Sequence, residues 1–435
     1  MKLTPLDDLV GRIMGSPARP LSRVAIEAWQ GAQLGRLIRY CTERSAFYRR
    51  KLAESTAAVS GPEDLAALPL TTGAELRAHG VEMVCVSQDS VARIISLHSS
   101  GTTGPAKRLW FTEADVERTL AFFHLGMGQM VEPGEHAAIL LPGATPDSTG
   151  DLLARALERL GVASTIFGLC PDPVRAAQAV GTLRPAVLVG FPVQILALAR
   201  MAVNLGIELS PVRSVLLCSD YIPENLARQV RELLGAEVFT HYGTVETGLG
   251  GAVDCAAHDG CHLRESDLLV EIIDPHTTLP VADSTWGEIV CTTLTRTGMP
   301  LIRYRTGDRG RLLSGVCGCG SAIRRLDRVQ GRIDQVRTLA HGSQLALAEL
   351  DELLFALSGL LDFTAALVTA NGRDGLHVCL TTVPGEATAV RRSALDRLIR
   401  RPSLRDLPVT VDLAPGTLIQ PAKRRLEDHR EDPRS

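Results

Sequence analysis

Short apolar runs alternate with amphipathic stretches through the middle of this sequence. Between residues 135 and 242, apolar runs that predict buried strands lie at 137–141, 163–167, 186–189, 214–218 and 237–240. Segments with apolar residues at helical spacing lie between these runs, at 149–160, 172–182, 192–205 and 223–234. Strand–helix alternation of this kind predicts a mostly parallel sheet with helices covering it.

The pattern changes on either side of this region. Amphipathic helices are predicted over 21–53, and a strand-rich stretch follows over 262–315, with strands at 268–273 and 287–293. The last hundred or so residues combine helical patterns with strand-like runs at 364–368 and 376–382. The 435 residues exceed one ordinary hydrophobic core, so more than one domain is expected.

We therefore predict an α/β fold built from two domains. A large N-terminal domain over 1–331 would hold helix-covered, mostly parallel sheets and a β-rich subdomain. A small mobile α+β domain over 332–435 would follow it as a lid.

Composition and charge narrow the class of protein. Apolar residues make up 45% and charged residues 22%, which is ordinary for a soluble globular protein. The net charge of −3 and the aromatic content of 4% argue against a nucleic-acid partner. No apolar run approaches the roughly 20 residues that span a bilayer, and the N-terminus lacks a signal-peptide pattern. We expect a cytoplasmic protein with no membrane partner, and a homodimer is compatible with these features.

A loop rich in small hydroxyl residues and glycine lies between two apolar runs. It consists of Ser99-Ser100-Gly101-Thr102-Thr103-Gly104-Pro105-Ala106-Lys107. Backbone N–H groups and hydroxyls in such a loop can surround phosphate oxygens, and a lysine adds positive charge. Composition alone fits either phosphate binding or a polar hairpin loop.

Two further motifs carry a carboxylate in a glycine-containing setting. Tyr242-Gly243-Thr244-Val245-Glu246-Thr247 follows a predicted strand, where ligands sit in open α/β sheets. There Glu246 offers a hard oxygen for Mg²⁺, and Tyr242 offers a flat face for a purine. In Tyr304-Arg305-Thr306-Gly307-Asp308, an aspartate in a turn can accept both hydroxyls of a ribose. Taken singly, each motif also fits a solvated loop or a capped turn.

In their order and spacing, the three motifs resemble the adenylate-forming (acyl-CoA synthetase-like) superfamily, and specifically its phenylacetate–CoA ligase branch. The resemblance extends from about residue 35 to residue 335. Other segments that are similar to this branch are Phe47-Tyr48-Arg49-Arg50-Lys51-Leu52, Leu68-Pro69-Leu70-Thr71-Thr72, Glu271-Ile272-Ile273-Asp274-Pro275, Gly287-Glu288-Ile289-Val290, Gly298-Met299-Pro300-Leu301-Ile302-Arg303 and Gly331-Arg332-Ile333-Asp334.

The resemblance implies an AMP-forming ligase that uses ATP, Mg²⁺ and coenzyme A to activate an organic carboxylic acid, of an aryl or small type. Glu246 would bind Mg²⁺, Asp308 would hold the ribose, and residues 99–107 with Lys107 would fold over the phosphates. Arg332 would contact the nucleotide, and Asp334 would be the hinge of the small domain.

The C-terminal segment departs from the branch. The family places a lysine here that reaches the α-phosphate, and this sequence has Gln420-Pro421-Ala422-Lys423-Arg424 with proline at the expected position. Lys423 or Arg424 are the candidate replacements, and we take Lys423 as the catalytic candidate. The departure leaves two alternatives open: transfer of the acyl group to a carrier protein or an amine, and a catalytically degenerate nucleotide-binding relative with a regulatory or scaffold role.

Four residues suggest a structural zinc site. Cys255 and His262 precede one predicted strand, while Cys317 and Cys319 follow the Tyr304–Asp308 motif, and Cys₃His is a common closed tetrahedral set. The spacing of these four residues is similar to that in many relatives of the phenylacetate–CoA ligase branch. Cys261 and His258 are competing ligands, and buried free thiols are the alternative to a metal.

Overall fold

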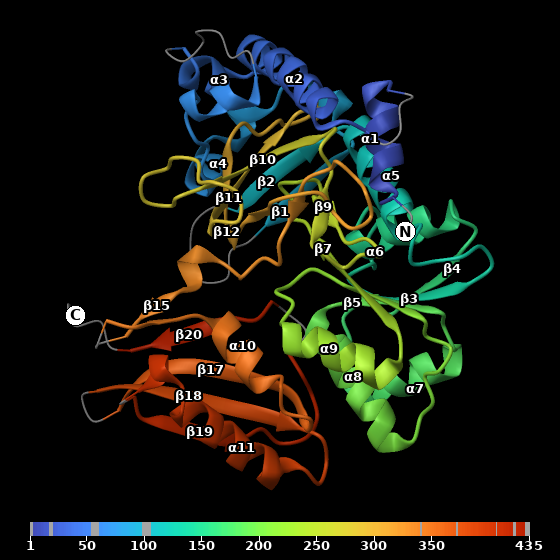
Figure 1. Cartoon of the computed structure of the whole chain (residues 1–435), viewed down its shortest axis with the longest axis vertical. Coiled ribbons are helices and arrows are strands. Elements are labelled where there is room, and N and C mark those ends of the chain that lie inside the picture. Colours follow the sequence, from blue (N-terminus) through green and yellow to red (C-terminus); the bar gives the residue numbers. More distant parts are fainter. Residues whose placement is uncertain are drawn as a thin grey trace. The chain divides into compact units, whose positions relative to one another are not determined.

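The computed structural model describes residues 3–16, 21–53, 61–97, 106–339, 342–370, 373–405, 407–420 and 423–430 (Figure 1). The chain divides into two compact units. Unit 1 comprises residues 1–129, 155–160 and 240–329, and unit 2 comprises residues 130–154, 161–239 and 330–435. Among the described residues, no helix is both long enough and apolar enough to cross a membrane.

Unit 1 combines N-terminal helices with antiparallel strands. Its helices and turns are α1 (Leu6–Met14), α2 (Arg23–Arg44), α3 (Ala46–Lys51), η1 (Pro62–Ala67), α4 (Gly73–His79), η2 (Gly80–Met83), η3 (Gln88–Ser90) and α5 (Glu113–Met127). Its strands are β1 (Arg93–Leu97), β2 (Lys107–Phe111), β8 (Ala252–Val253), β9 (Cys261–Leu263), β10 (Leu268–Ile273), β11 (Gly287–Thr293), β12 (Tyr304–Gly310), β13 (Leu312–Leu313) and β14 (Arg325–Leu326).

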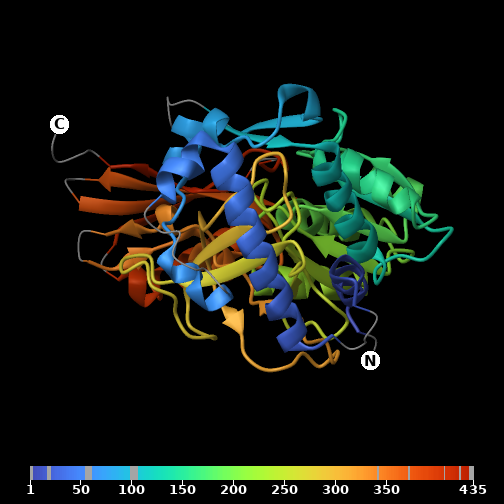
Figure 2. The same ribbon diagram turned by 90° about the horizontal axis from the view of Figure 1, so that it is seen from above.

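The strands of unit 1 form three antiparallel groups. Strands β1 and β2 make a two-stranded sheet, and β10, β11 and β12 make a three-stranded one. The third group runs β13-β14-β9-β8 and continues into the end of β7 (Glu237–Tyr242), whose Tyr242 is opposite Ala252. Figures 1 and 2 show α2 lying across the β10–β12 sheet, where Gln30 Nε2 donates to the carbonyl of Leu268 at 3.2 Å.

Unit 2 begins with the strand–helix alternation that the sequence predicts. The parallel strands β4 (Ala163–Ile166), β3 (His136–Leu140), β5 (Val187–Gly190) and β6 (Ser214–Leu217) lie in that order across the sheet. Their connecting helices are α6 (Thr149–Glu158), α7 (Pro173–Leu183), α8 (Pro192–Leu205) and α9 (Glu224–Leu234), and α6 ends in unit 1. Strands buried on both faces read as continuous apolar runs, which is why β3, β5 and β6 were predictable, whereas β4 lies at the edge of the sheet and is partly exposed.

The C-terminal part of unit 2 is a four-stranded sheet with two helices. The strand order is β19-β18-β17-β20; β17 and β18 are antiparallel and each outer strand is parallel to its neighbour. The elements are η4 (Ile333–Gln335), β15 (Arg337–Thr338), β16 (Gln344–Leu345), α10 (Leu347–Leu354), β17 (Leu360–Ala370), β18 (Arg373–Thr382), α11 (Ala387–Ile399), η5 (Pro402–Leu404), β19 (Val409–Leu413) and β20 (Leu426–His429).

The C-terminal part is packed against α8 and α9 within unit 2. One buried apolar core runs from the parallel strands through α8 into the β17–β18 pair. Arg200 on α8 donates to the carbonyl of Leu357 at 2.6 Å, and Glu352 on α10 accepts from the backbone N–H of Glu224 at 2.7 Å. The carboxylate of Glu352 therefore satisfies the N-terminus of α9, where helix N–H groups need partners.

Two local predictions from the sequence were wrong. Residues 304–308 were expected to form a turn, but they lie in strand β12. His262 was expected in a loop, but it lies in strand β9 opposite Arg325. The partner of His262, Arg325, is distant in the sequence, so the residues around His262 do not reveal that strand. Strand β12 pairs with the preceding strand β11, and the glycine at 307 within its motif is the residue that favoured a turn.

Candidate functional site

Three polar side chains from different parts of unit 1 meet at one point. Lys107 Nζ lies 2.6 Å from Glu246 Oε1, and the hydroxyl of Tyr304 donates to the same oxygen at 3.0 Å. Lys107 Nζ also donates to the Tyr304 hydroxyl at 3.3 Å. Lys107 begins β2, Glu246 follows β7, and Tyr304 begins β12. We call this group the Glu246 centre.

The Glu246 centre keeps a buried carboxylate ionised. Only 6% of Glu246 is exposed. Burial alone would raise the pKa of Glu246, but the Lys107 ammonium and the Tyr304 hydroxyl outweigh burial and hold this pKa below its ordinary value. An ionised carboxylate in a protected position is a suitable ligand for a divalent cation.

The loop that carries Glu246 has a fixed shape. The backbone N–H of Thr244 donates to Thr247 Oγ1 at 2.9 Å, and the N–H of Leu249 donates to the carbonyl of Thr244 at 2.8 Å. Arg264 Nη2 holds the carbonyl of Thr247 at 3.0 Å. A Cβ atom at Gly243 would lie 2.5 Å from the carbonyl oxygen of Leu249, so this close approach requires glycine.

Asp308 lies on the strand that also supplies Tyr304. The register between β11 and β12 shifts between Arg305 and Arg309, and the Tyr304 hydroxyl and the Asp308 carboxylate both bond to residues at or just after the end of β7. The Tyr242 hydroxyl donates to Asp308 Oδ2 at 2.9 Å. Burial and the negative charge of Asp308 raise the pKa of Tyr242 well above its ordinary value, so the phenol remains a donor. Strand β12 thus brings together two of the three predicted motifs.

The third motif lies mostly outside the described residues. Ser99, Ser100, Gly101, Thr102, Thr103 and Gly104 fall in the undescribed range 98–105, and of the predicted phosphate loop only Ala106 and Lys107 are described. Of these two described residues, Lys107 connects the motif to Glu246. Sequence reasoning assigned no role to Tyr304, although its place at the head of the Asp308 motif was the available signal.

The remaining predicted nucleotide contacts belong to unit 2. Arg332 Nε lies 3.1 Å from Asp334 Oδ1, and both side chains are exposed. Lys423 is also exposed, and Pro421 lies outside the described residues.

Arg424 is committed to a buried acidic cluster, which removes it as a replacement for the α-phosphate lysine. Its guanidinium pairs with Asp351, and its Nε lies 3.2 Å from Asp362 Oδ1. The ring of Phe363 lies 4.2 Å from the guanidinium carbon. The backbone N–H of Arg424 donates to Asp220 Oδ2 at 3.4 Å. Arg424 is therefore an anchor of the C-terminal segment.

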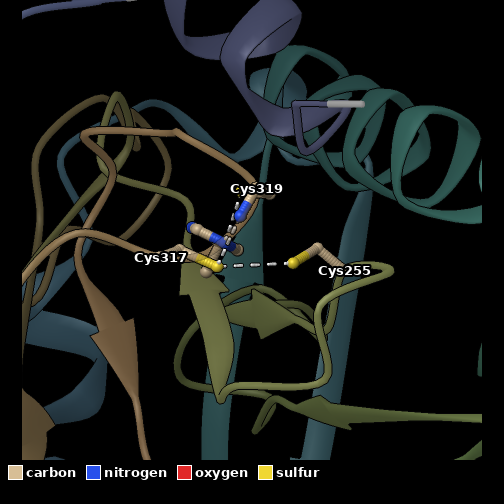
Figure 3. Close-up of side chains that lie close together, drawn as sticks. Cys255, Cys317 and Cys319 are labelled. Atoms are coloured by element: carbon tan, nitrogen blue, oxygen red, sulfur yellow. Dashed lines mark hydrogen bonds between the residues drawn. The ribbon is translucent and has the colours of Figure 1, made fainter. Parts of the chain in front are cut away.

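The four predicted metal ligands converge in unit 1. The ligand atoms of Cys255, His262, Cys317 and Cys319 lie within 4.8 Å of one another, and all four residues are buried. Cys255 Sγ lies 3.7 Å from Cys317 Sγ, too far for a disulfide, and Cys319 Sγ lies 3.5 Å from His262 Nε2. Figure 3 shows the sulfur atoms of Cys255 and Cys317 facing each other beside Cys319.

Hydrogen bonds around this cluster distinguish the ligands from their competitors. His262 Nδ1 lies 3.2 Å from the carbonyl of Ile323, which leaves Nε2 toward the sulfurs. The competitor Cys261 contacts Thr240 Oγ1 at 3.3 Å, and the competitor His258 contacts Asp254 Oδ2 at 2.9 Å. Both competitors thus have other partners.

Comparison with known proteins gives consistent results. The family model for AMP-binding enzymes matches residues 37–295. The phenylacetate–coenzyme A ligase of Thermus thermophilus is 31% identical over 366 residues, which cover 81% of this chain and 80% of that protein. The corresponding ligase of Escherichia coli is 29% identical over 77% of each chain. The structure of 2-hydroxyisobutyryl-CoA ligase in its post-adenylation state matches with a TM-score of 0.80 and 20% identity, over 94% of this chain and 90% of that one, which shows a shared fold.

Proposed function

The chain belongs to the AMP-binding enzyme family and to its phenylacetate–coenzyme A ligase branch, and from this premise we propose an AMP-forming acid–thiol ligase. The substrate is an organic carboxylic acid of an aryl or small type, activated by ATP and then transferred to coenzyme A. The observation that supports the proposal is the Glu246 centre joined through β12 to Asp308, since an ionised carboxylate, a lysine and a second carboxylate lie together in one unit.

The reaction has two balanced steps. In the first, a carboxylate oxygen of the acid bonds to the α-phosphorus of ATP, and the bond to pyrophosphate breaks. In the second, the thiol sulfur bonds to the acyl carbon, AMP leaves with the electron pair, and the thiol proton goes to solvent. Both steps develop negative charge that nearby cations and N–H groups stabilise.

The residues of this chain have separate tasks in the proposal. Glu246 would hold Mg²⁺, because its ionised carboxylate fits that ion, and the ion would neutralise phosphate charge. Lys107 exchanges Glu246 for a phosphate oxygen, Asp308 accepts the ribose hydroxyls, and Ser99 to Gly104 surround the phosphates. Tyr242, Gly243 and Thr244 form the wall beside the nucleotide.

The segment after residue 331 contributes the lid in the proposal. Residues 332–435 form this lid domain, with Asp334 as its hinge and Arg332 beside the nucleotide. Lys423 supplies the cation for the α-phosphate. This role for Lys423 is supported by the next residue, Arg424. Because Arg424 is anchored by Asp362 and Asp220, the backbone at Lys423 can occupy only a limited set of positions.

We also propose a structural Zn²⁺ ion held by Cys255, His262, Cys317 and Cys319. Four protein donors leave no open position, so the ion stabilises the fold and takes no part in the reaction. Free cysteines support a cytoplasmic location, since a reducing compartment keeps thiols unpaired.

The test is pyrophosphate release from ATP with a panel of aryl and small carboxylic acids. An active acid is then supplied with coenzyme A, with an acyl carrier protein or with hydroxylamine. Thioester formation with coenzyme A is expected. Release of pyrophosphate with transfer only to the carrier protein or the amine would identify the other acceptor. ATP binding without release for any acid would identify a degenerate nucleotide-binding relative.

A further inference from the structure

A groove in unit 1 lies outside the Glu246 centre. It has a volume of about 370 Å³ and is formed by α4, η2 and the start of β2. Its lining combines cationic, aromatic and small residues: Arg77, His79, Gly80, Val81, Arg108 and Trp110. No step of the proposed reaction uses these side chains.

Two arginines in the groove have no charge partner within the described part of the chain. Neither Arg77 nor Arg108 has an ion-pair or side-chain hydrogen-bond partner among the residues that the structure describes. Glu82 also lines the groove, but its carboxylate is engaged by Arg50 and by His79 Nδ1, the latter at 3.0 Å. The groove therefore offers positive charge to an anion, and guanidinium groups match phosphate oxygens well.

Strand β2 separates the groove from the Glu246 centre. Consecutive side chains on a strand point to opposite faces, so Lys107 faces Glu246 while Arg108 faces the groove. Trp110 lies on the same face as Arg108, two residues further along, and is opposite Ile94 in the β1–β2 pair.

An aromatic face accompanies the charge. A Cβ atom at Gly80 would lie 3.3 Å from Trp110 Cζ3, so the turn backbone approaches the indole closely. This contact fixes the ring, whose side chain is only partly buried. Val81 next to it is 73% exposed, which leaves an apolar edge beside the ring. A fixed indole near free guanidinium groups suits a planar base that carries a phosphate.

The groove is close to the reacting centre. A Cβ atom at Gly73 would lie 3.5 Å from the Tyr304 hydroxyl and 3.8 Å from Arg77 Nη1. A single glycine therefore separates the groove from Tyr304, which bonds to Glu246. A ligand anchored in the groove by one end could reach the Glu246 centre through a flexible arm.

We propose that this groove binds the 3′-phosphorylated adenosine end of coenzyme A. Arg77 and Arg108 bond to the 3′-phosphate, and Trp110 stacks on the adenine. This inference rests on the proposed function, because coenzyme A is the acceptor only in that reaction. ATP is the other ligand that could occupy the groove, because it also carries an adenine and phosphates.

The test compares wild type with the double variant Arg77→Gln/Arg108→Gln. Isothermal titration with adenosine 3′,5′-bisphosphate measures binding without any acid substrate. We expect at least a tenfold weaker affinity in the double variant, since each lost guanidinium–phosphate contact weakens binding several-fold. Arg36→Gln, at an exposed position on α2, is the matched control and should bind as wild type does.

Steady-state kinetics then show whether the phosphate that the groove binds belongs to coenzyme A or to ATP. In the double variant, the KM for coenzyme A should rise about tenfold. In wild type, coenzyme A that lacks the 3′-phosphate should show a KM raised by a similar factor. The KM for ATP in pyrophosphate release should stay within twofold. Trp110→Leu should weaken binding of the bisphosphate, with circular dichroism and thermal unfolding to confirm that the variant folds.

The outcomes separate this inference from the proposed function. Unchanged affinity for the bisphosphate in the double variant would overturn the inference while leaving the ligase reaction intact. A raised KM for ATP in place of coenzyme A would also overturn it, since the groove would then serve the first substrate. If no acid releases pyrophosphate but the bisphosphate binds to wild type and not to the double variant, the proposed function fails and the site stands.

Discussion

The ammonium of Lys107 lies 2.6 Å from the carboxylate of Glu246, although 138 residues separate them in the chain. The pair joins the start of β2 to the loop after β7, and the hydroxyl of Tyr304 bonds to both residues. A cation and an anion that neutralise each other in the absence of ligand can separate when phosphate and a divalent cation arrive. The resting pair therefore leaves neither charge without a partner, and an unpaired charge at the buried Glu246 would be strongly destabilising.

Glu246→Gln should lower the rate of pyrophosphate release by at least about 100-fold, because the neutral amide is a poor Mg²⁺ ligand. Tyr304→Phe retains the charges of Glu246 and Lys107 and removes the hydrogen bonds that the Tyr304 hydroxyl makes to both, so about a tenfold loss is expected. The measurement is ATP-dependent pyrophosphate release at saturating acid. Glu43→Gln, exposed on α2, is the control. Equal rates for Glu246→Gln and the control would remove Glu246 from the catalytic machinery.

Lys423→Ala should reduce pyrophosphate release by about 100-fold or more, since loss of one charge-stabilising donor costs about 3 kcal/mol. The thermal unfolding temperature should change little, because Lys423 is exposed. Arg425→Ala, two positions along the same segment and also exposed, is the matched control. A wild-type rate for Lys423→Ala would show that this lysine does not replace the one expected at Pro421.

Purified protein should contain about one zinc per chain by elemental analysis, and Cys317→Ser should remove most of it while lowering the thermal unfolding temperature. Cys379→Ser is the control, since Cys379 lies on β18 outside the cluster and should leave the zinc content unchanged. A content below about 0.2 zinc per chain after mild purification would show that the four residues form a cluster of thiols without metal.

The elements that were predicted well are those whose pattern is local. Strands β10 and β11 occupy the predicted residues 268–273 and 287–293, because buried strands bounded by turn residues are visible as apolar runs. Helix α8 likewise spans the predicted 192–205, starting with proline at its first turn and ending before Gly206. The four residues Cys255, His262, Cys317 and Cys319 were predicted to converge because three cysteines and a histidine form a common metal-binding set, and the structure brings their ligand atoms within 4.8 Å of one another.

The partnerships that were not predicted depend on distant segments. Tyr304 bonds to Glu246 only because β12 approaches the loop after β7, and no residue near either one indicates this. Arg424 appeared from the sequence to be a free cation, since arginine is rarely buried. Its burial arises from three carboxylates on separate elements, Asp220, Asp351 and Asp362, which only the folded chain brings together.

The buried cluster around Arg424 predicts an unusual pH dependence of stability in unit 2. Burial raises the pKa of Asp351 to about 7, and the nearby carboxylates of Asp220 and Asp362 raise it as well, while Arg424 opposes them. In the unfolded chain, an aspartate titrates near pH 4. Between these two values the folded state binds more protons than the unfolded state, so the unfolding free energy falls as pH rises.

The contribution of Asp351 is thus fully present below about pH 4 and is lost as pH rises through about 7. Urea unfolding of wild type and Asp351→Asn at pH 5 and pH 8 measures it. At pH 5 the folded state holds Asp351 protonated, and asparagine resembles this neutral form, so the two proteins should differ least there. At pH 8 wild type should have lost about 2 kcal/mol of unfolding free energy relative to the variant. Glu43→Gln serves as a control whose difference from wild type should not change with pH. A difference in unfolding free energy that is the same at pH 5 and pH 8, with the variant less stable at both, would mean that Asp351 is ionised throughout and stabilises the fold as a simple partner of Arg424.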